Sequence, residues 1–315
     1  MTRIARPAAC AALLLCLLAV SVAGCSAGEE DQEASVQPQG ENLVVTLGTK
    51  DFSESILIGE LYRQALEAKG IKVNLRKAIG PTEEIDRELQ SGRIDGYPEY
   101  LGIAVTVAAG QEEGGSTPEE TYQLAKEFYA GRGQAISEQT PFQNVDVIAT
   151  TQYFAQRRGL ATIDDLNRLS SITLGGQAPF EKRQQGLVGL REAYGLDNVR
   201  FEPIPYGDQY QALDRKEIEA ANGGSTDGQF ASGSYKVLED TEDVFGFQHV
   251  ALVIDEAKLE ELGGRDFMRI IDNVNRRLTS SVMIAMNREV VLDGQDEAVV
   301  AERFLGGAGL LERSG

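Results

Sequence analysis

Short β-prone runs alternate with amphipathic segments along the first half of the chain. Residues 43–47 form a β-rich run. Apolar residues at helical spacing extend from Ser53, which can cap a helix, to Gly70, which can end it. The same helical pattern returns between Thr82 and Gly92, with one short strand predicted before it and another beginning at residue 94. This alternation of strand and helix is typical of an α/β fold with parallel strands.

The second half of the chain repeats this plan. A capping box with proline at the first helical position spans 117–120, still in the first half. In the second half, the pattern predicts a strand over 172–174 and a helix over 181–194. Residues 250–254 form a further apolar strand, after which the chain is mostly helical. The folded part is large for one core and comfortable for two. We therefore expect an α/β protein built from two similar lobes.

The N-terminal segment has the pattern of an export signal. Arg3 and Arg6 precede an apolar run over residues 8–22, and Cys25 follows small residues. The run is too short for a good transmembrane helix, although an uncut N-terminal anchor is the alternative. This boundary resembles the lipobox of bacterial lipoproteins. The resemblance implies cleavage of a signal peptide over 1–24 and lipidation of Cys25, which places the protein outside the cytoplasm, anchored to the cell membrane by lipid.

The residues after Cys25 cannot fold by themselves. The stretch over 25–41 is polar and acidic, with too few large apolar side chains to bury. We interpret this stretch as a flexible tether between the lipid and the folded part.

Charge excludes one class of partner. The whole chain has a formal net charge of −19, and loss of Arg3 and Arg6 with the signal makes the mature protein more acidic still. A surface of this charge repels nucleic acid and anionic lipid, so lipid rather than basic residues must supply the anchor.

Composition also argues against metal and redox chemistry. The three cysteines, Cys10, Cys16 and Cys25, all lie in the N-terminal segment, and His249 is the single histidine. Thiolate metal sites, disulfides and multi-histidine sites are therefore not expected in the folded part. We expect no metal and no cofactor.

Two motifs are candidates for ligand contact. In the segment 95–100, Tyr97 and Tyr100 flank a proline where a strand should reach the carboxyl edge of its sheet, and ligands bind at such edges in open α/β folds. The alternative is an aromatic corner that packs for stability. In the segment 48–53, Lys50 precedes a helix start and could bind an anion, although a surface lysine in a loop is the commoner explanation.

Other patterns carry little chemistry. The glycine cluster over 222–228 lacks the lysine of a phosphate loop and is typical of a turn at a strand end. Acidic pairs such as Glu83 with Glu84 lie in first helical turns, where they complement the helix dipole. The motifs therefore favour binding over catalysis.

Four segments together resemble one family, the solute-binding proteins of osmoprotectant ABC transporters, which carry glycine betaine, choline, carnitine or proline betaine. The segments are 48–54, 94–100, 180–183 and 225–228, and the resemblance extends from about residue 43 to residue 311. It implies a two-lobed fold of the type II periplasmic binding proteins, with a hinge of two crossings near 146–150 and 247–250. Lobe 1 is then 42–146 plus 250–315, and lobe 2 is 147–249.

The resemblance also implies site residues. Lys50 and Arg183 match the family positions that grip the ligand carboxylate, and a paired lysine and arginine suit that role. Tyr100 matches one tyrosine of the aromatic cage around the quaternary ammonium. We expect the ligand to contact Lys50, Phe52, Tyr97, Tyr100, Asp146, Arg183, Thr226 and Gln248.

Several positions depart from the family pattern. Asp146, Gly224 and Gln248 stand where the family has tyrosines, and Ile103 replaces a threonine that helps to bind carboxylate. Phe52, Tyr206 or Tyr210 are candidates to replace the missing rings, and Asp146 could neutralise a cation directly.

The leading hypothesis is a lipid-anchored monomer that closes two lobes around a small polar solute and delivers it to an ABC permease with its ATPase. Two alternatives use the same cleft. One is a lipoprotein enzyme with carboxylates such as Asp95, Asp146 and Asp227, and the other is a lipoprotein with a partner or signalling role.

Overall fold

The computed structural model describes residues 44–111 and 114–311. The predicted signal peptide over 1–24, Cys25 and the tether to residue 41 lie outside the described residues. Within the described ranges, no helix has the length and apolar character needed to cross a lipid bilayer.

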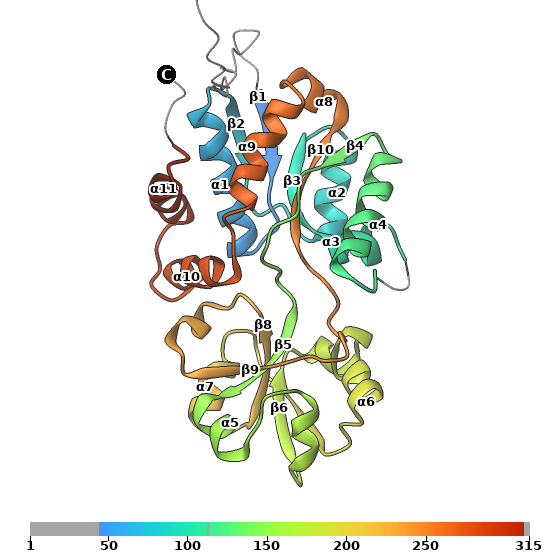
Figure 1. Ribbon diagram of the computed structural model, residues 1–315, viewed down its shortest axis with the longest axis vertical. Helices are drawn as coiled ribbons and strands as arrows, with labels where there is room; N and C mark the ends of the chain where they lie inside the picture. Colours follow the sequence, from blue (N-terminus) through green and yellow to red (C-terminus); the bar gives the residue numbers. More distant parts are fainter. Residues whose placement is uncertain (1–43, 112–113, 312–315) are drawn as a thin grey trace, which may run out of the picture. The chain divides into compact units, whose positions relative to one another are not determined.

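The chain folds around two five-stranded sheets, each with its own helices (Figure 1). We call the first sheet with its helices lobe 1. Its strand order is β2-β1-β3-β10-β4, with β1 Val44–Gly48, β2 Lys72–Arg76, β3 Gly96–Tyr100, β4 Gln134–Ile136 and β10 Val250–Asp255. We call the second sheet with its helices lobe 2. Its order is β7-β6-β8-β5-β9, with β5 Asp146–Thr151, β6 Ile172–Gly176, β7 Val199–Pro203, β8 Ala220–Gly224 and β9 Tyr235–Leu238.

The prediction of parallel strands is correct only in part. β1 is parallel to β2 and β3, and β6 is parallel to β7 and β8. β10 runs antiparallel to both of its neighbours in lobe 1, and β5 does the same in lobe 2. The reason is topological, because each of these strands enters its sheet directly from the other lobe. The predicted type II two-lobed α/β fold with two crossings is confirmed.

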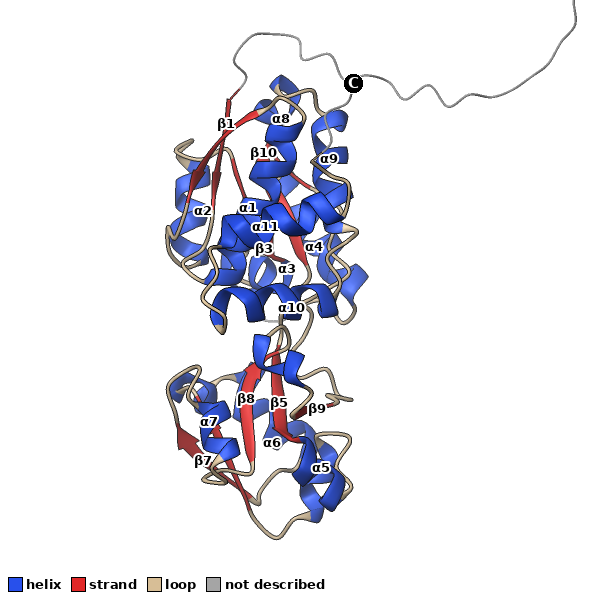
Figure 2. Cartoon of the chain, turned by 90° about the vertical axis from the view of Figure 1, so that its left-hand side faces the viewer, coloured by secondary structure: helices blue, strands red, loops and turns tan. Residues whose placement is uncertain are grey.

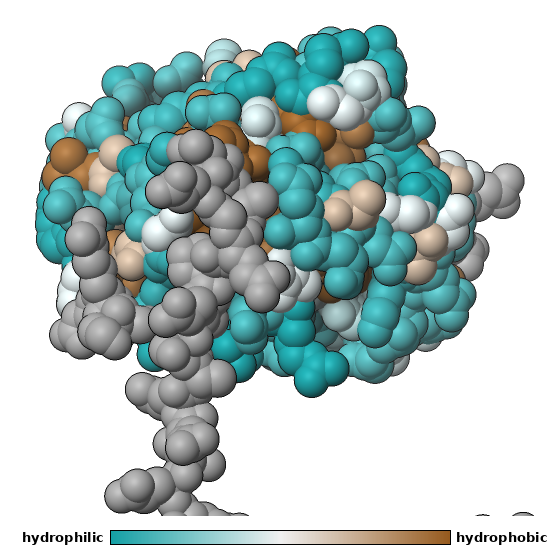
Figure 3. Space-filling model, turned by 90° about the horizontal axis from the view of Figure 1, so that it is seen from above, coloured by the Kyte–Doolittle hydropathy of each residue, from teal (hydrophilic) through white to brown (hydrophobic). Residues whose placement is uncertain are grey.

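The helices cover both faces of each sheet. In lobe 1, one face packs mainly against α1 Ser53–Ala68, α9 Arg265–Asn275, α10 Ser280–Val291 and α11 Glu297–Gly307, and the other against α2 Thr82–Gln90 and α4 Pro118–Ala130. The short helices α3 Leu101–Ile103 and α8 Glu256–Glu261 complete lobe 1, and α5 Gln152–Arg158, α6 Gly189–Tyr194 and α7 Gln209–Asp214 belong to lobe 2. The face drawn in Figure 3 is mostly hydrophilic with scattered apolar residues, in keeping with the acidic composition.

Two predicted helix starts differ from the structure. Ser53 and Thr82 are the first residues inside their helices, and the preceding Phe52 and Pro81 occupy the cap positions without a side-chain hydrogen bond. The capping box is confirmed in one half: Thr117 Oγ1 accepts a hydrogen bond from the backbone N of Glu120 at 3.1 Å, whereas the Glu120 carboxylate accepts from the backbone N of Ser116 and not of Thr117.

The predicted helix over 181–194 is wrong over its first half. Single turns over Ala178–Lys182 and Gln184–Val188 precede α6, and Gln185 and Gly186 have non-helical backbone angles. A Cβ at Gly186 would lie 2.4 Å from the carbonyl oxygen of Phe180, so only glycine fits this break. The break leaves Arg183 between the two turns.

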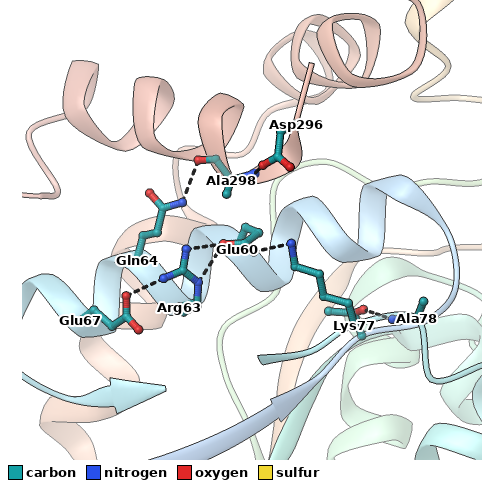
Figure 4. Close-up of polar contacts among 9 residues, drawn as sticks. Glu60, Arg63, Gln64, Glu67, Lys77, Ala78, Asp296 and Ala298 are labelled. Carbon is teal, nitrogen blue, oxygen red and sulfur yellow. Dashed lines mark hydrogen bonds and ion pairs between the residues drawn. The ribbon is translucent and has the colours of Figure 1, made fainter. Parts of the chain in front are cut away.

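Helix α1 of lobe 1 carries a buried carboxylate that is paired with two cations. Glu60 is 3% exposed and pairs with Arg63 and Lys77 at 2.6 Å each (Figure 4). Beside it, Gln64 Nε2 donates to the carbonyl oxygen of Ala298 at 2.8 Å and so ties α11 to α1. Burial alone would raise the pKa of Glu60, but hydrogen bonds from Lys77 and Arg63 hold it below its ordinary value.

Glu60→Gln should therefore lower the free energy of unfolding at pH 7 by about 1–3 kcal/mol. Because the folded pKa of Glu60 is lowered, its contribution is present above the unfolded pKa of about 4.3 and is lost as the pH falls through the folded value. Urea unfolding at pH 7 and at acid pH checks this, with the exposed Glu67→Gln as the matched control on the same helix. A difference from wild type that does not shrink at acid pH would contradict it.

Candidate functional site

Several of the predicted site residues lie where strands end or begin at the lobe junction. Lys50 follows β1, and Tyr100 ends β3. In lobe 2, Asp146 begins β5 directly opposite Gly224, the last residue of β8. β1, β3 and β8 end here at their carboxyl ends, and the antiparallel β5 begins beside them; open α/β sheets bind ligands at such an edge.

Lys50 lies in a buried ion pair that the sequence did not indicate. Lys50 is 5% exposed, and its Nζ donates to Glu99 Oε1. The backbone N of Tyr100 donates to the same oxygen at 2.6 Å, and the Tyr100 ring centroid is 5.1 Å from the ammonium. Glu99 is fully buried, so the charge of Lys50 is compensated within lobe 1. The one available signal was Glu99, which lies directly before Tyr100 in the segment 95–100.

Tyr97 and Tyr100 lie on opposite sides of β3. Tyr97 is fully buried, packs in the core beneath α2 and α4, and has its hydroxyl 3.2 Å from that of Tyr129. The structure therefore places Tyr97 in the core and not at the carboxyl edge. The physical reason is the two-residue period of a strand, which sends side chains three positions apart to opposite faces.

Tyr100 is joined by Phe52 at the end of lobe 1. Their ring centroids are 5.6 Å apart, and Phe52 is 39% exposed. The Tyr100 hydroxyl donates to Glu54 Oε1 at 2.7 Å. One aromatic face of the pair thus remains accessible at the junction.

Two carboxylates lie at the facing end of lobe 2. Asp146 accepts a hydrogen bond from Asn222 Nδ2 at 2.8 Å, and Asp227 accepts hydrogen bonds from the hydroxyls of Tyr206 and Tyr210. Burial raises the pKa of both carboxyls, while these hydrogen bonds, and for Asp146 the charge of Arg183, oppose the rise. The hydroxyls of Tyr206 and Tyr210 are therefore both engaged by Asp227, and Tyr206 as a residue is 56% exposed.

Arg183 is the predicted residue that lines a measurable cavity. The cavity has a volume of about 480 Å³ and is bounded by both lobes. Its lining residues are Gly102, Thr106, Gly114, Gly115 and Thr121 from lobe 1, and Arg183, Gln184, Gln185, Asp243, Val244, Gly246 and Phe247 from the lobe 2 side. Arg183 is exposed there and makes no ion pair within residues 44–111 and 114–311. The other seven predicted residues are not among its lining residues.

Gln248 and Thr226 are buried in the junction itself. Gln248 Oε1 accepts a hydrogen bond from the backbone N of Ile103 at 3.1 Å. Thr226 is 1% exposed, and its carbonyl oxygen accepts a hydrogen bond from Asn287 Nδ2 at 2.9 Å. Both residues therefore connect segments of the chain and present little free surface.

Among residues 44–111 and 114–311, no three His, Cys, Asp or Glu side chains are grouped to hold an ion. His249 Nδ1 lies 2.8 Å from the carbonyl oxygen of Thr140, which gives this histidine a structural contact.

Known proteins match the chain along most of its length. The glycine-betaine-binding protein of Pseudomonas aeruginosa is 26% identical over 272 residues, covering 82% of this chain and 86% of that protein. The carnitine transport binding protein OpuCC of Listeria monocytogenes is 23% identical over 267 residues, covering 83% of this chain and 85% of that protein.

Solved structures share the fold. A crystal structure described as a glycine betaine/carnitine/choline ABC transporter has a TM-score of 0.79 at 26% identity, covering 85% of this chain and 99% of that one. Apo YehZ from Escherichia coli has a TM-score of 0.73 at 23% identity, covering 86% and 100%.

A family model described as the substrate-binding domain of ABC-type glycine betaine transport systems matches residues 44–307. With this match and the type II arrangement of its two sheets, the chain belongs to that family of substrate-binding domains.

Proposed function

We propose that this protein is an extracytoplasmic solute-binding lipoprotein that delivers a small zwitterionic or cationic osmolyte to an ABC permease with its ATPase. The family membership supports transport, and the relatives named for binding glycine betaine and carnitine support the class of solute. Lipidation at Cys25 after removal of residues 1–24, a monomeric state, and lobe limits of 42–146 plus 250–315 and 147–249 are parts of the same proposal.

The observation that carries the proposal is the free guanidinium of Arg183 on a cavity bounded by both lobes. Arginine binds carboxylate through two parallel hydrogen bonds, and it keeps its charge at every physiological pH. A solute carboxylate at Arg183 would bridge lobe 2 to the lobe 1 wall around Thr106. Ligand contacts to both lobes favour the closed arrangement by differential affinity.

The cationic end of the solute is assigned to the junction beside Phe52, Tyr100 and Asp146. The exposed ring of Phe52 offers a π face, and the Asp146 carboxylate offers a negative charge. This pairing of one ring pair with a carboxylate takes the place of the tyrosines that the family pattern has at Asp146, Gly224 and Gln248.

Binding is favoured over catalysis by the state of the acidic residues. Asp95 Oδ2 accepts a hydrogen bond from the backbone N of Thr46 at 2.7 Å, and both oxygens of Asp227 accept from tyrosines. These carboxylates are engaged in structural hydrogen bonds, whereas a catalytic pair needs access to a substrate. We therefore propose that the protein is not an enzyme.

Arg183→Ala should weaken binding of glycine betaine and carnitine at least tenfold, about 1.4 kcal/mol or more. Choline has the cationic group without the carboxylate, so its affinity should change far less. Titration calorimetry with the three solutes measures the affinities. The matched control is Arg215→Ala, which removes an exposed arginine that follows α7 in lobe 2. Equal losses for choline and glycine betaine would contradict a carboxylate contact, and unchanged affinities would remove Arg183 from the site.

A further inference from the structure

One buried carboxylate, that of Glu54 in the first turn of α1, connects several distant segments of the chain. Glu54 is 5% exposed. Its Oε1 accepts hydrogen bonds from the Tyr100 hydroxyl at 2.7 Å and from Asn144 Nδ2 at 2.9 Å. Its Oε2 accepts one from Asn287 Nδ2 at 2.7 Å. The donors come from β3, from the segment just before β5, and from α10. A single side chain therefore joins these three segments by hydrogen bonds.

One of these donors, Asn287, also forms a hydrogen bond to lobe 2. Asn287 Nδ2 also donates to the carbonyl oxygen of Thr226 at 2.9 Å, and Thr226 follows β8. Its neighbour Ser225 is fixed to the crossing segment, because its backbone N donates to the carbonyl oxygen of Val145 at 2.8 Å. Glu54 is therefore linked to lobe 2 through Asn287, which donates both to Glu54 and to Thr226.

A close backbone contact lies next to this network. A Cβ at Gly228 would be 2.6 Å from the Cα of Arg288, a distance that real side chains do not reach. The turn Gly228–Ser232 thus packs directly on α10, which lies between the rest of lobe 1 and the β8 end of lobe 2 (Figure 2). Lobe 2 touches lobe 1 here independently of the two covalent crossings.

The Glu54 carboxylate has no cation beside it among the ion pairs of the described residues. Its charge is supported by neutral donors alone, and burial raises its pKa. A carboxylate buried in this way is costly unless each of its donors stays in place. Movement of lobe 2 relative to α10 must therefore preserve this contact or break hydrogen bonds to a buried carboxylate.

We propose that Glu54 is a positioning residue that couples the solute-side ring of Tyr100 to the Thr226 turn of lobe 2, so that lobe closure pivots about this contact. The inference rests on the proposed function, because it assumes that the solute enters between the lobes. Glu54 itself does not touch the solute. It acts by holding Tyr100 in lobe 1 and the Ser225–Thr226 turn in lobe 2 in one fixed relation.

The test uses the full chain with Glu54→Gln, which keeps the size of the side chain and replaces one acceptor oxygen with an NH₂ donor. Hydrogen-exchange mass spectrometry without solute should show about tenfold faster exchange over residues 225–228 in the variant. Glu67→Gln, an exposed glutamate on the same helix, is the matched control and should exchange like wild type.

Adding glycine betaine or choline as probes then separates positioning from simple stability. In wild type, the probe should protect both 50–55 in lobe 1 and 225–228 in lobe 2. In Glu54→Gln, the probe should still protect 50–55, lose the protection of 225–228, and bind at least tenfold more weakly. A merely structural role would change both segments together, and unchanged exchange at 225–228 with unchanged affinity would overturn the proposal.

Failure of the variant to fold and failure of the wild type to bind a probe each have a defined consequence. If Glu54→Gln does not fold, Asn287→Ala, which removes the donor shared by Glu54 and Thr226, is measured in its place with the same expected results. If the wild type binds none of the probes, the proposed function fails for these solutes, while the exchange of residues 225–228 without solute still decides whether Glu54 couples the lobes.

Discussion

Tyr97→Ala is expected to destabilise the fold by about 3–5 kcal/mol, the range for emptying a buried aromatic site. Tyr97 is fully buried among residues of β3, α2 and α4, so its removal leaves a cavity that its neighbours cannot fill. Because the side chain faces away from the carboxyl edge of the sheet, the affinity of the folded protein for glycine betaine should not change. Urea unfolding and titration calorimetry measure the two quantities separately.

Tyr97→Phe is the matched control for this substitution. It retains the ring and removes the hydroxyl contact with Tyr129, so the loss should be about 1 kcal/mol. A large loss of affinity with little loss of stability in Tyr97→Ala would restore the interpretation of Tyr97 as a solute contact.

Lys50→Met is expected to cost about 3–5 kcal/mol of stability, because it leaves the Glu99 carboxylate buried without its cation. The side chains of Lys50 and Glu99 are 7% and 0% exposed, so water cannot replace the missing partner. The double variant Lys50→Met/Glu99→Leu removes both charges and should recover most of the stability.

The double variant also decides the role of Lys50 in binding. The family resemblance implies that Lys50 grips the solute carboxylate, whereas the buried pair shows its charge already compensated by Glu99. From the pair we expect glycine betaine to bind the double variant as it binds wild type. A tenfold or greater loss in a stably folded double variant would instead assign Lys50 to the solute.

Much of the architecture was predictable because secondary structure follows local periodicity. The strands at 43–47 and 250–254, the helix after Ser53 and the capped helix at Thr117 all depend on patterns within a few residues. The helix over 181–194 was mispredicted for the same reason. Its composition is helical, but the Gly186 backbone must pass close to the Phe180 carbonyl, and that contact is invisible in local periodicity.

The candidate site was predictable in its location and less so in its contacts. The motif at 95–100 correctly indicated the end of a strand. It did not indicate which face of the strand each tyrosine occupies, and this places Tyr97 in the core and Tyr100 at the junction. Glu54 ends the segment 48–54, but its contacts were not predictable, because its donors Asn144 and Asn287 are far away in the sequence.

The sequence by itself determined the α/β class, the two lobes, the family and the absence of cysteine from the folded part, because these depend on residue type and local order. Only the tertiary structure decided that β5 and β10 run against their neighbours, that Lys50 is paired with Glu99, and that Asn287 donates both to Glu54 and to Thr226. The physical reason is that the charge and hydrogen-bond partners of a buried group are fixed by chain segments brought together from distant positions. Local patterns specify the elements, and long-range contacts specify which of their side chains are free to meet a solute.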